Sequence, residues 1–321
     1  MILLLMFIGV DHGTAGIRFA AREEEEVRVF ELSRKDAAVM ACDAILREVE
    51  QGLEVKTEEI ELIALSYSMG DGFSTIKGIN RVRNRGLKSG EGAGTKVGGG
   101  TKVFNAIKAA DIPAIMIPGI NRDSERIDRR MKFFSHGASP EKVGVAYHIY
   151  KKGFENFIFS DVSSNTVTVC VAKGVIAGAI DACLGSPGLY QGPIDLQLLR
   201  DIDEGKLSAN EAFSNAGVLN KRWWKERDDD GLLALDTLAL FVAMEISAML
   251  VLMVDYEIST CDIFLTGSMG DSLRMKGEID KLVGVNAKTL TRYSAAIGCA
   301  EIADDVFHGV KNILGIEVEE R

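Results

Sequence analysis

The sequence predicts an α/β protein built from two similar domains, and two observations carry this prediction. Apolar strand-like segments alternate with segments of helical periodicity, which is the pattern of the α/β class. The second half of the chain also repeats the opening of the first. Without a gap, the repeat aligns Asp11 with Asp161, Ile17 with Val167 and Phe30 with Ile180. A repeat of half the chain indicates a duplicated domain rather than a solenoid; two unrelated hairpins that match by chance are the alternative.

The first domain is expected to open with three short strands and to continue with alternating helices and strands. The connection at residues 11–16 is too short for a helix and is rich in residues that favour turns. The segment 36–51 carries apolar side chains at helical spacing and ends at Gly52. The expected strands are residues 7–10, 17–21, 27–30, 60–66 and 112–117, and the expected helices are residues 36–51 and 140–150.

The second domain is expected to follow the same order of elements, with insertions. Two lysines and a glycine at residues 151–153 stop the preceding helix, so the predicted domains are residues 1–152 and 153–321. Alternation of strands and helices predicts mostly parallel pairing after each opening meander. The expected strands are residues 157–161, 167–171, 175–180, 262–266 and 287–290, and the expected helices are residues 236–257, 271–283 and 294–310.

Composition and charge exclude several classes of protein. The 321-residue chain is 47% hydrophobic and 26% charged, which is ordinary for a globular protein. A formal net charge of −10 argues against general nucleic-acid binding. Its five cysteines form no Cys-x-x-Cys pair, so a zinc site or disulfide framework is not expected and a cytoplasmic location fits. The apolar run at residues 239–253 contains Glu245, which favours a buried core helix over a membrane span.

Three short motifs lie in the strand-end turns. They are Asp11-His-Gly-Thr14, Asp161-Val-Ser-Ser-Asn-Thr166 and Phe264-Leu-Thr-Gly-Ser-Met-Gly270. In type and order they resemble the first phosphate loop, second phosphate loop and adenosine loop of the ASKHA superfamily of acetate and sugar kinases, heat-shock ATPases and actin. That resemblance implies two ribonuclease H-like domains, each with a mixed five-stranded sheet and helices, and a cleft between them.

Within the superfamily, the chain is most similar to acetate and butyrate kinases, because His136 precedes a helix containing Ala146 and Tyr147. Over its full length the sequence resembles the archaeal family called methanogenesis marker protein 12. This second resemblance implies a role connected with methanogenesis.

The superfamily resemblance implies ATP and Mg²⁺ as ligands, because a triphosphate needs donors and its metal ion needs oxygen ligands. Asp11 and Asp161 would hold Mg²⁺ and act in catalysis, with His136 as a further catalytic candidate. The alternatives are a turn-stabilising role for each aspartate and a capping or packing role for the histidine. The candidate nucleotide-binding residues are Gly13, Thr14, Ser163, Ser164, Asn165, Gly267, Ser268 and Gly270; for the glycines at 267 and 270, a plain strand-to-helix connection is the alternative.

The glycine-rich stretch at residues 86–105 is expected to be a mobile loop or a cationic flap over an anionic substrate. Arg85 and Lys96 are the candidate substrate-binding residues. Butyrate kinases carry Gly-Arg-Gly-Gly in the similar region, whereas this chain has Glu91 at the arginine position. Acyl kinases carry His-Leu-Gly at the second phosphate loop, whereas this chain has Asp161-Val-Ser163. Transfer of phosphate to acetate or butyrate is therefore not expected.

Two classes of function stay open at this point. One is an ATP-dependent phosphotransferase or ATPase that acts on a small anionic acceptor. The other is a nucleotide switch or assembly subunit that acts on a partner protein. The Met- and Ala-rich helix near residues 239–253 also predicts a homodimer, since it offers an apolar face.

Overall fold

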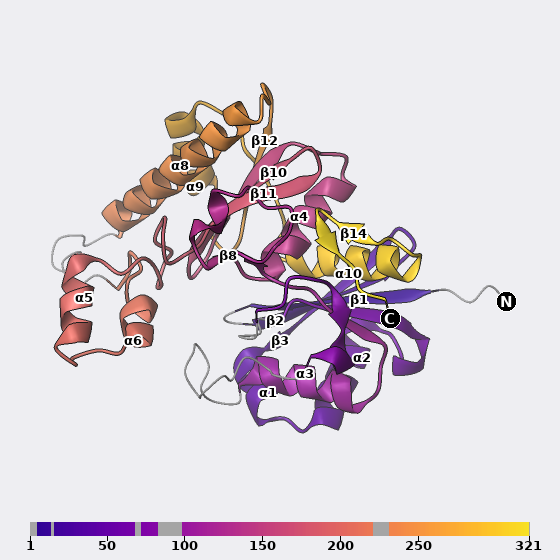
Figure 1. The fold of residues 1–321 in the computed structure, drawn as a ribbon. Helices are drawn as coiled ribbons and strands as arrows, with labels where there is room; N and C mark the ends of the chain where they lie inside the picture. Colours follow the sequence, from indigo (N-terminus) through magenta and orange to yellow (C-terminus); the bar gives the residue numbers. More distant parts are fainter. Residues whose placement is uncertain (1–4, 14–15, 68–71, 83–97, 221–230, 321) are drawn as a thin grey trace. The chain divides into compact units, whose positions relative to one another are not determined.

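The chain divides into two compact units. The computed structural model describes residues 5–13, 16–67, 72–82, 98–220 and 231–320 (Figure 1). Unit 1 comprises Met1–Gly153 together with Tyr293–Arg321, and unit 2 comprises Phe154–Arg292. The sequence-based division assigned residues 293–321 to the second domain. In the structure they belong to unit 1, because the helix that they contain packs against the first strand of the chain.

Unit 1 is built on a six-stranded sheet of order β3-β2-β1-β4-β6-β5. The first three strands pair antiparallel, whereas β1–β4 and β4–β6 pair parallel. The sequence predicted five strands; the additional β5 is a two-residue edge strand that pairs with β6. The strands are β1 (Met6–His12), β2 (Gly16–Glu23), β3 (Glu26–Ser33), β4 (Ile60–Leu65), β5 (Lys77–Gly78) and β6 (Ala114–Met116).

Strand β1 is buried on both faces. Side chains alternate along a strand, so Ile8 and Val10 share the face that packs with α2 (Cys42–Leu53) and α3 (Gly99–Ala109). Gly9 faces the opposite side, where α10 (Ser294–Phe307) lies so close that a Cβ atom at Gly9 would overlap the α10 backbone. The C-terminal helix therefore supplies the second covering layer of this sheet.

Helix α10 also crosses α4 (Glu141–Lys151), and glycines make the close approach possible. A Cβ atom at Gly298 would overlap the carbonyl oxygen of Gly144. A buried hydrogen bond joins the same helices, with Nδ1 of His148 3.1 Å from Oε1 of Glu301.

Two elements of unit 1 differ from the sequence expectation. The predicted helix at residues 36–51 is two helices, α1 (Arg34–Val39) and α2, because Met40 and Ala41 have extended backbone. Helix α3 begins at Gly99, inside the stretch predicted to be a loop. Gly99 leaves no room for a side chain, because a Cβ atom there would overlap the carbonyl oxygen of Arg34, and a Cβ atom at Gly100 would lie 3.1 Å from the His12 ring. Glycine has a low helix propensity, so close packing rather than propensity explains the glycines at the start of this helix.

Among its described residues, unit 1 also contains four short strands and three 3₁₀ turns. The strands are β7 (Ile120–Asn121), β8 (His136–Ala138), β14 (Asn312–Ile313) and β15 (Ile316–Glu317), and the turns are η1 (Thr57–Glu59), η2 (Ile79–Arg81) and η3 (Met131–Phe133). After β15, Val318 forms a parallel bridge with Ile76. The C-terminal segment is thus joined to the chain next to β5.

Unit 2 contains a five-stranded sheet, as the sequence predicted, and the order of its strands is β11-β10-β9-β12-β13. Strands β9, β10 and β11 form the antiparallel meander, and β12 and β13 continue it in parallel. The strands are β9 (Phe157–Val162), β10 (Thr166–Ala172), β11 (Val175–Ile180), β12 (Asp262–Thr266) and β13 (Lys288–Thr289).

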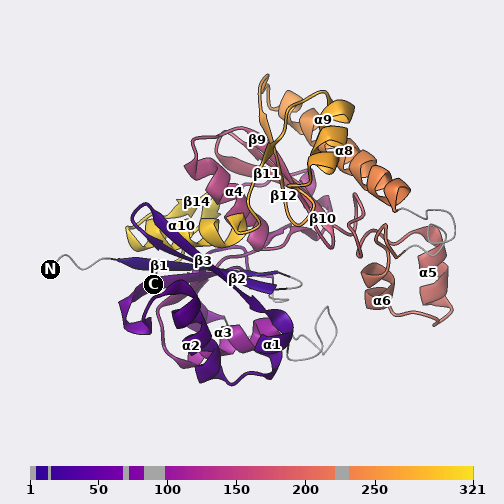
Figure 2. The same cartoon turned by 180° about the vertical axis from the view of Figure 1, so that it is seen from behind.

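Helix α8 (Leu232–Asp255) packs on β9 and β10 and lies beside α9 (Leu273–Val283), as Figure 2 shows. Among the described residues it is the one helix long and apolar enough to cross a membrane by length and composition. Its inward residues, Glu245 among them, are buried within unit 2, which is the arrangement of a core helix. The insertion before it carries α5 (Leu196–Asp203) and α6 (Ala209–Ser214), which the sequence analysis did not predict.

Candidate functional site

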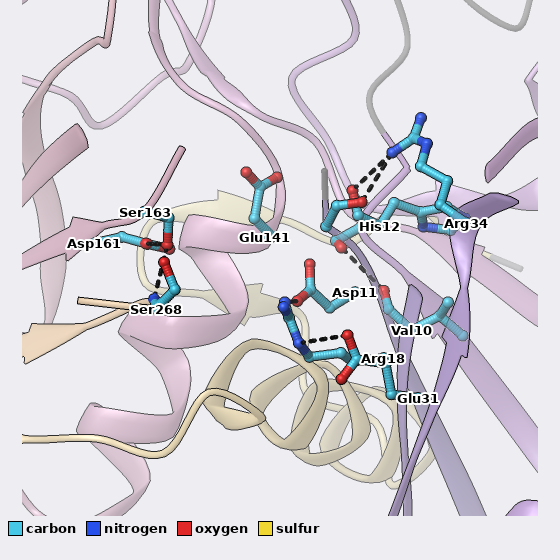
Figure 3. A network of polar contacts seen from close by, with 12 residues as sticks. Val10, Asp11, His12, Arg18, Glu31, Arg34, Glu141, Asp161, Ser163 and Ser268 are labelled. Carbon is cyan, nitrogen blue, oxygen red and sulfur yellow. Dashed lines mark hydrogen bonds and ion pairs between the residues drawn. The ribbon is translucent and has the colours of Figure 1, made fainter. Parts of the chain in front are cut away.

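Asp11 lies at the end of β1 and pairs with Arg18 across the β1–β2 hairpin. Its Oδ2 accepts a hydrogen bond from Nη1 of Arg18 at 3.0 Å (Figure 3). The residue is only 3% exposed. Its Oδ1 is buried and has no hydrogen-bond partner among the described residues. A buried carboxylate oxygen without a donor is costly unless a ligand, cation or water satisfies it.

Burial controls the electrostatics of this turn. It raises the pKa of Asp11 from 3.8 to about 6, although Arg18 acts in the opposite direction. Burial also lowers the pKa of the neighbouring His12 to about 3, and the positive charge of Arg34 adds to this effect. His12 is therefore neutral at physiological pH. Its ring packs edge-on against Tyr67, 4.8 Å between centroids.

Arg34 fixes the backbone of the same turn. Its Nη1 donates to the carbonyl oxygen of Gly13 at 2.9 Å, as Figure 3 shows. A Cβ atom at Gly13 would lie 2.9 Å from Nη1 of Arg18 and 2.8 Å from the Gly16 carbonyl oxygen, so a side chain there would crowd the ion pair. Thr14, the predicted phosphate ligand, lies outside the described residues.

Two further charged residues act on Asp11 from the first turn of α4. The charge of Glu141 raises the pKa of Asp11, and that of Lys142 lowers it. Lys142 is almost fully buried, and its Nζ lies 3.1 Å from Oε1 of Glu141. Sequence reasoning missed both residues. Their signal was an acid–base pair directly after Pro140, at the start of a helix.

His136 lies before α4, as expected, and it is an exposed residue of β8 in an antiparallel pair with Asn121. Arg85 and Lys96, the predicted substrate ligands, lie outside the described residues. The first turn of α4, which follows β8, carries the charges that act on Asp11.

The second candidate loop, in unit 2, is closed by its own hydrogen bonds. Oγ of Ser163 donates to Oδ1 of Asp161 at 2.8 Å and accepts from the backbone N–H of Ser268 at 3.1 Å (Figure 3). The Met269 N–H also donates to the Val162 carbonyl oxygen at 2.9 Å. The predicted second phosphate loop and adenosine loop are therefore brought together within unit 2.

Gly267 is required by this closure. Its φ of 90° lies in the left-handed region that favours glycine. A Cβ atom there would overlap Oδ1 of Asp161 and Oγ of Ser163. Gly270 is equally restricted, because a Cβ atom would overlap the backbone of Thr266.

A segment after β11 supports the other predicted residues of this loop. The carbonyl oxygen of Ser164 accepts from the N–H groups of Tyr190 and Gln191, at 3.0 and 2.8 Å. The side-chain amide of Asn165 donates to Oε1 of Gln191 at 3.2 Å. Ser164 and Asn165 are thus held by residues that the sequence analysis had not assigned to the site.

The β1–β2 and β9–β10 hairpins differ by one residue in the length of the turn, and this difference gives the two aspartates different partners across the hairpin. Asp11 faces Arg18, whereas Asp161 faces Val167. The ungapped repeat had placed Ile17, not Arg18, over Val167. The second turn is one residue tighter, and a bulge after Cys170 restores the alignment in the next strand. As a result, Asp161 has an apolar residue where Asp11 has its ion-pair partner.

Comparison with known proteins identifies relatives along the whole chain. The UPF0285 protein of Methanosarcina barkeri is 50% identical over 324 residues, covering 98% of this chain and 99% of the relative. The chain belongs to the UPF0285 family. Its member from Methanocaldococcus jannaschii is 44% identical, again with 98% of this chain and 99% of the relative covered. No protein-family model matches the sequence.

Solved structures with a similar fold are two-domain ASKHA proteins. A propionate kinase from Francisella tularensis matches 94% of this chain and 99% of its own, with a TM-score of 0.57 and 13% identity. An acetate kinase from Porphyromonas gingivalis matches 94% of this chain and 98% of its own, with a TM-score of 0.55 and 11% identity. A ROK family glucokinase from Streptomyces griseus, in complex with glucose and AMPPNP, matches 94% of this chain and 99% of its own. Its TM-score is 0.50 and its sequence identity is 15%. Because the sequence identities are low, these structural similarities show the fold alone. They confirm the predicted fold class.

Proposed function

We propose that this UPF0285 protein binds ATP with Mg²⁺ and uses it for phosphoryl transfer or hydrolysis. The main observation is a hairpin that occurs in both units, with Asp11 and Asp161 near the end of the first strand of each. One carboxylate oxygen of Asp11 is buried and has no hydrogen-bond partner among the described residues. The ASKHA fold supports the proposal, because a structural neighbour with that fold is described in complex with AMPPNP.

The residues present fit such a ligand in unequal ways. Oδ1 of Asp11 is an unpartnered acceptor, which suits Mg²⁺ or a water that the ion holds. No group of three or more His, Cys, Asp or Glu side chains that could hold a metal is found in the described parts of the chain. The ion would therefore take most of its oxygen ligands from phosphates and water, as Mg²⁺ commonly does. ATP supplies the phosphoryl group and Mg²⁺ neutralises its charge.

The protein's own groups would position this ligand. Asp11 would orient water molecules around the ion, and Asp161 is the candidate for the same role in unit 2. Gly13 would let the backbone approach a phosphate, and Ser268 and Gly270 would border the nucleoside. Lys142 would add a positive charge near the first turn. The replaced arginine and histidine argue against acetate or butyrate as the acceptor, so the acceptor is proposed only as a small anion.

A nucleotide switch or assembly subunit is the second candidate, and the outward face of α8 favours it. This face carries large exposed apolar side chains in a helix with few charges. Exposed apolar surface of this kind marks protein contacts. We propose that it forms a homodimer or binds a partner protein. The relatives come from methanogens, which supports a role connected with methanogenesis. The same sources support the proposal that this chain is a member of the methanogenesis marker protein 12 family.

Calorimetric titration with ATP·Mg²⁺ tests the nucleotide proposal. The wild type should bind with a saturable signal, and Asp11→Asn should weaken binding at least tenfold because the ion loses a charged ligand. Asp43→Asn is the matched control, since Asp43 pairs with Arg47 on the exposed surface of α2. Well-folded wild type that binds no ATP at millimolar concentration would refute the proposal. Equal binding by wild type and Asp11→Asn would refute the role of Asp11.

A further inference from the structure

Glu245 is a buried carboxylate in the middle of the apolar helix α8. It is 3% exposed. Its Oε2 accepts from the Thr168 hydroxyl at 2.6 Å, and its Oε1 accepts from the Ser186 N–H at 3.1 Å. The Thr168 hydroxyl lies 2.7 Å from that of Ser160 on β9, so the carboxylate ends a chain of hydrogen bonds across the sheet. An acidic residue in such a helix needs a structural or functional reason.

The Ser186 contact is tight. A Cβ atom at the preceding Gly185 would overlap Oε1 of Glu245, so glycine is needed for the chain to pass this carboxylate. Ser186 is itself buried and begins the segment that crosses the second candidate loop. One carboxylate oxygen thus anchors one end of this segment.

The segment 186–191 packs on the residues of the second candidate loop. Thr166 donates to the Pro187 carbonyl oxygen at 2.8 Å, and the Leu189 N–H donates to the Ser163 carbonyl oxygen at 3.0 Å. A Cβ atom at Gly188 would overlap Asn165. Every turn residue between β9 and β10 is therefore in contact with a segment that Glu245 holds.

We propose that Glu245 is a positioning residue that holds the second phosphate loop through the segment 185–191, and that its ionisation state sets how firmly the loop is held. This proposal rests on the proposed nucleotide site. The ionised carboxylate accepts two charge-assisted hydrogen bonds, which are roughly twice as strong as neutral ones. Because the Ser186 hydrogen bond by itself lowers the pKa of Glu245, linkage requires this bond to hold the segment more firmly when the carboxylate is ionised and less firmly when a solvent proton is bound.

The surroundings place this titration in the physiological range. Burial raises the pKa of Glu245 to about 7. Hydrogen bonds from Thr168 and Ser186 act in the opposite direction, and the charge of Asp181, after β11, raises the pKa further. Thr168 and Ser160 on the sheet are not titratable in this range.

Hydrogen–deuterium exchange measured by mass spectrometry at pH 6 and pH 8 tests the proposal. After correction for intrinsic exchange, peptides covering residues 163–166 and 185–191 should be at least fivefold better protected at pH 8 in the wild type. Glu245→Gln keeps the shape but cannot ionise, so its protection should stay at the wild-type pH 6 level at both values. Glu301→Gln, which alters a buried carboxylate of unit 1, should retain the wild-type profile in these peptides.

Equal protection of the wild type at both pH values would overturn the proposal, and this measurement needs no variant to fold. Wild-type protection in Glu245→Gln at pH 8 would overturn it as well. ATP·Mg²⁺ affinity gives the functional readout: Glu245→Gln should bind at least threefold more weakly than wild type at pH 8. Wild type that binds no ATP refutes the proposed function, whereas the exchange data still decide the role of Glu245.

Discussion

Asp11 shows how burial outweighs an ion pair at a single residue. Its pKa is raised from 3.8 to about 6 despite Arg18, so the folded state binds this proton more tightly than the unfolded state. Stability attributable to Asp11 is therefore present at low pH and is lost as the pH rises to about 6. A shift of about two units corresponds to about 3 kcal/mol.

We therefore expect the free energy of unfolding of the wild type, relative to Asp11→Asn, to fall by up to about 3 kcal/mol between pH 4 and pH 7. Urea denaturation of both proteins at several pH values measures this difference. A difference that rises with pH would mean that the Arg18 ion pair dominates instead.

Gly267 gives a second residue-scale prediction. Gly267→Ala combines a left-handed backbone with overlap on Asp161 and Ser163, so it should destabilise the protein by about 1–3 kcal/mol and weaken ATP·Mg²⁺ binding. Gly277→Ala is the control. Gly277 lies in the interior of α9 with nothing near its Cβ position, so alanine should stabilise by about 0.5–1 kcal/mol. Thermal unfolding compares the two, and an unchanged Gly267→Ala protein would contradict the assignment.

Several site residues follow from the sequence, and others depend on tertiary structure. Asp11 and Asp161 could be located from the sequence as candidates, because each lies near the end of an apolar strand. The Asp11–Arg18 pair was not, since a hairpin register depends on turn length, and one residue changes the facing side chain. Glu141 and Lys142 act on Asp11 only because α4 packs beside β1 through α10, a contact between distant parts of the chain.

At the scale of elements, periodicity predicted the strands of both meanders and the long helices. Periodicity did not predict elements whose position depends on packing rather than on local propensity. Helix α3 starts on glycines that must pass close to Arg34 and Tyr67. Helix α5 has no buried residue, and the sequence analysis gave it no element. The C-terminal helix was predicted correctly as an element, but no local signal places it on the sheet of unit 1.

The α4–α10 crossing allows an element-scale prediction. Gly298→Ala would force the helices apart at Gly144, so it should cost at least about 2 kcal/mol of unfolding free energy. Gly78→Ala is the control in the same unit, because Gly78 has a negative φ and nothing near its Cβ position. Its effect should stay within about 1 kcal/mol and favour stability. Urea denaturation tests both, and equal stabilities would show that the helices can separate at little cost.

At the scale of the whole molecule, duplication explains why one pattern of strands occurs in both units. The repeat supplies each unit with the same meander, whereas among the described residues the insertion with α5 and α6 belongs to unit 2. Duplication also leaves the copies free to diverge, as the polar environments of Asp11 and Asp161 show. The family relationship extends over this entire arrangement, because the relatives match both halves of the chain.

The outward face of α8 leads to a prediction about assembly. Met244, Val251 and Val254 are 56%, 69% and 74% exposed on a helix whose inner face is buried. A second copy of the chain can cover such a face with an identical one, and burial of apolar surface would drive the association. The wild type should therefore be a dimer in light scattering coupled to size-exclusion chromatography, and Met244→Lys with Val251→Lys should be monomeric. Val39→Lys, at an 85% exposed position of unit 1, should leave the dimer intact. A monomeric wild type would refute the dimer and leave the face to a partner protein.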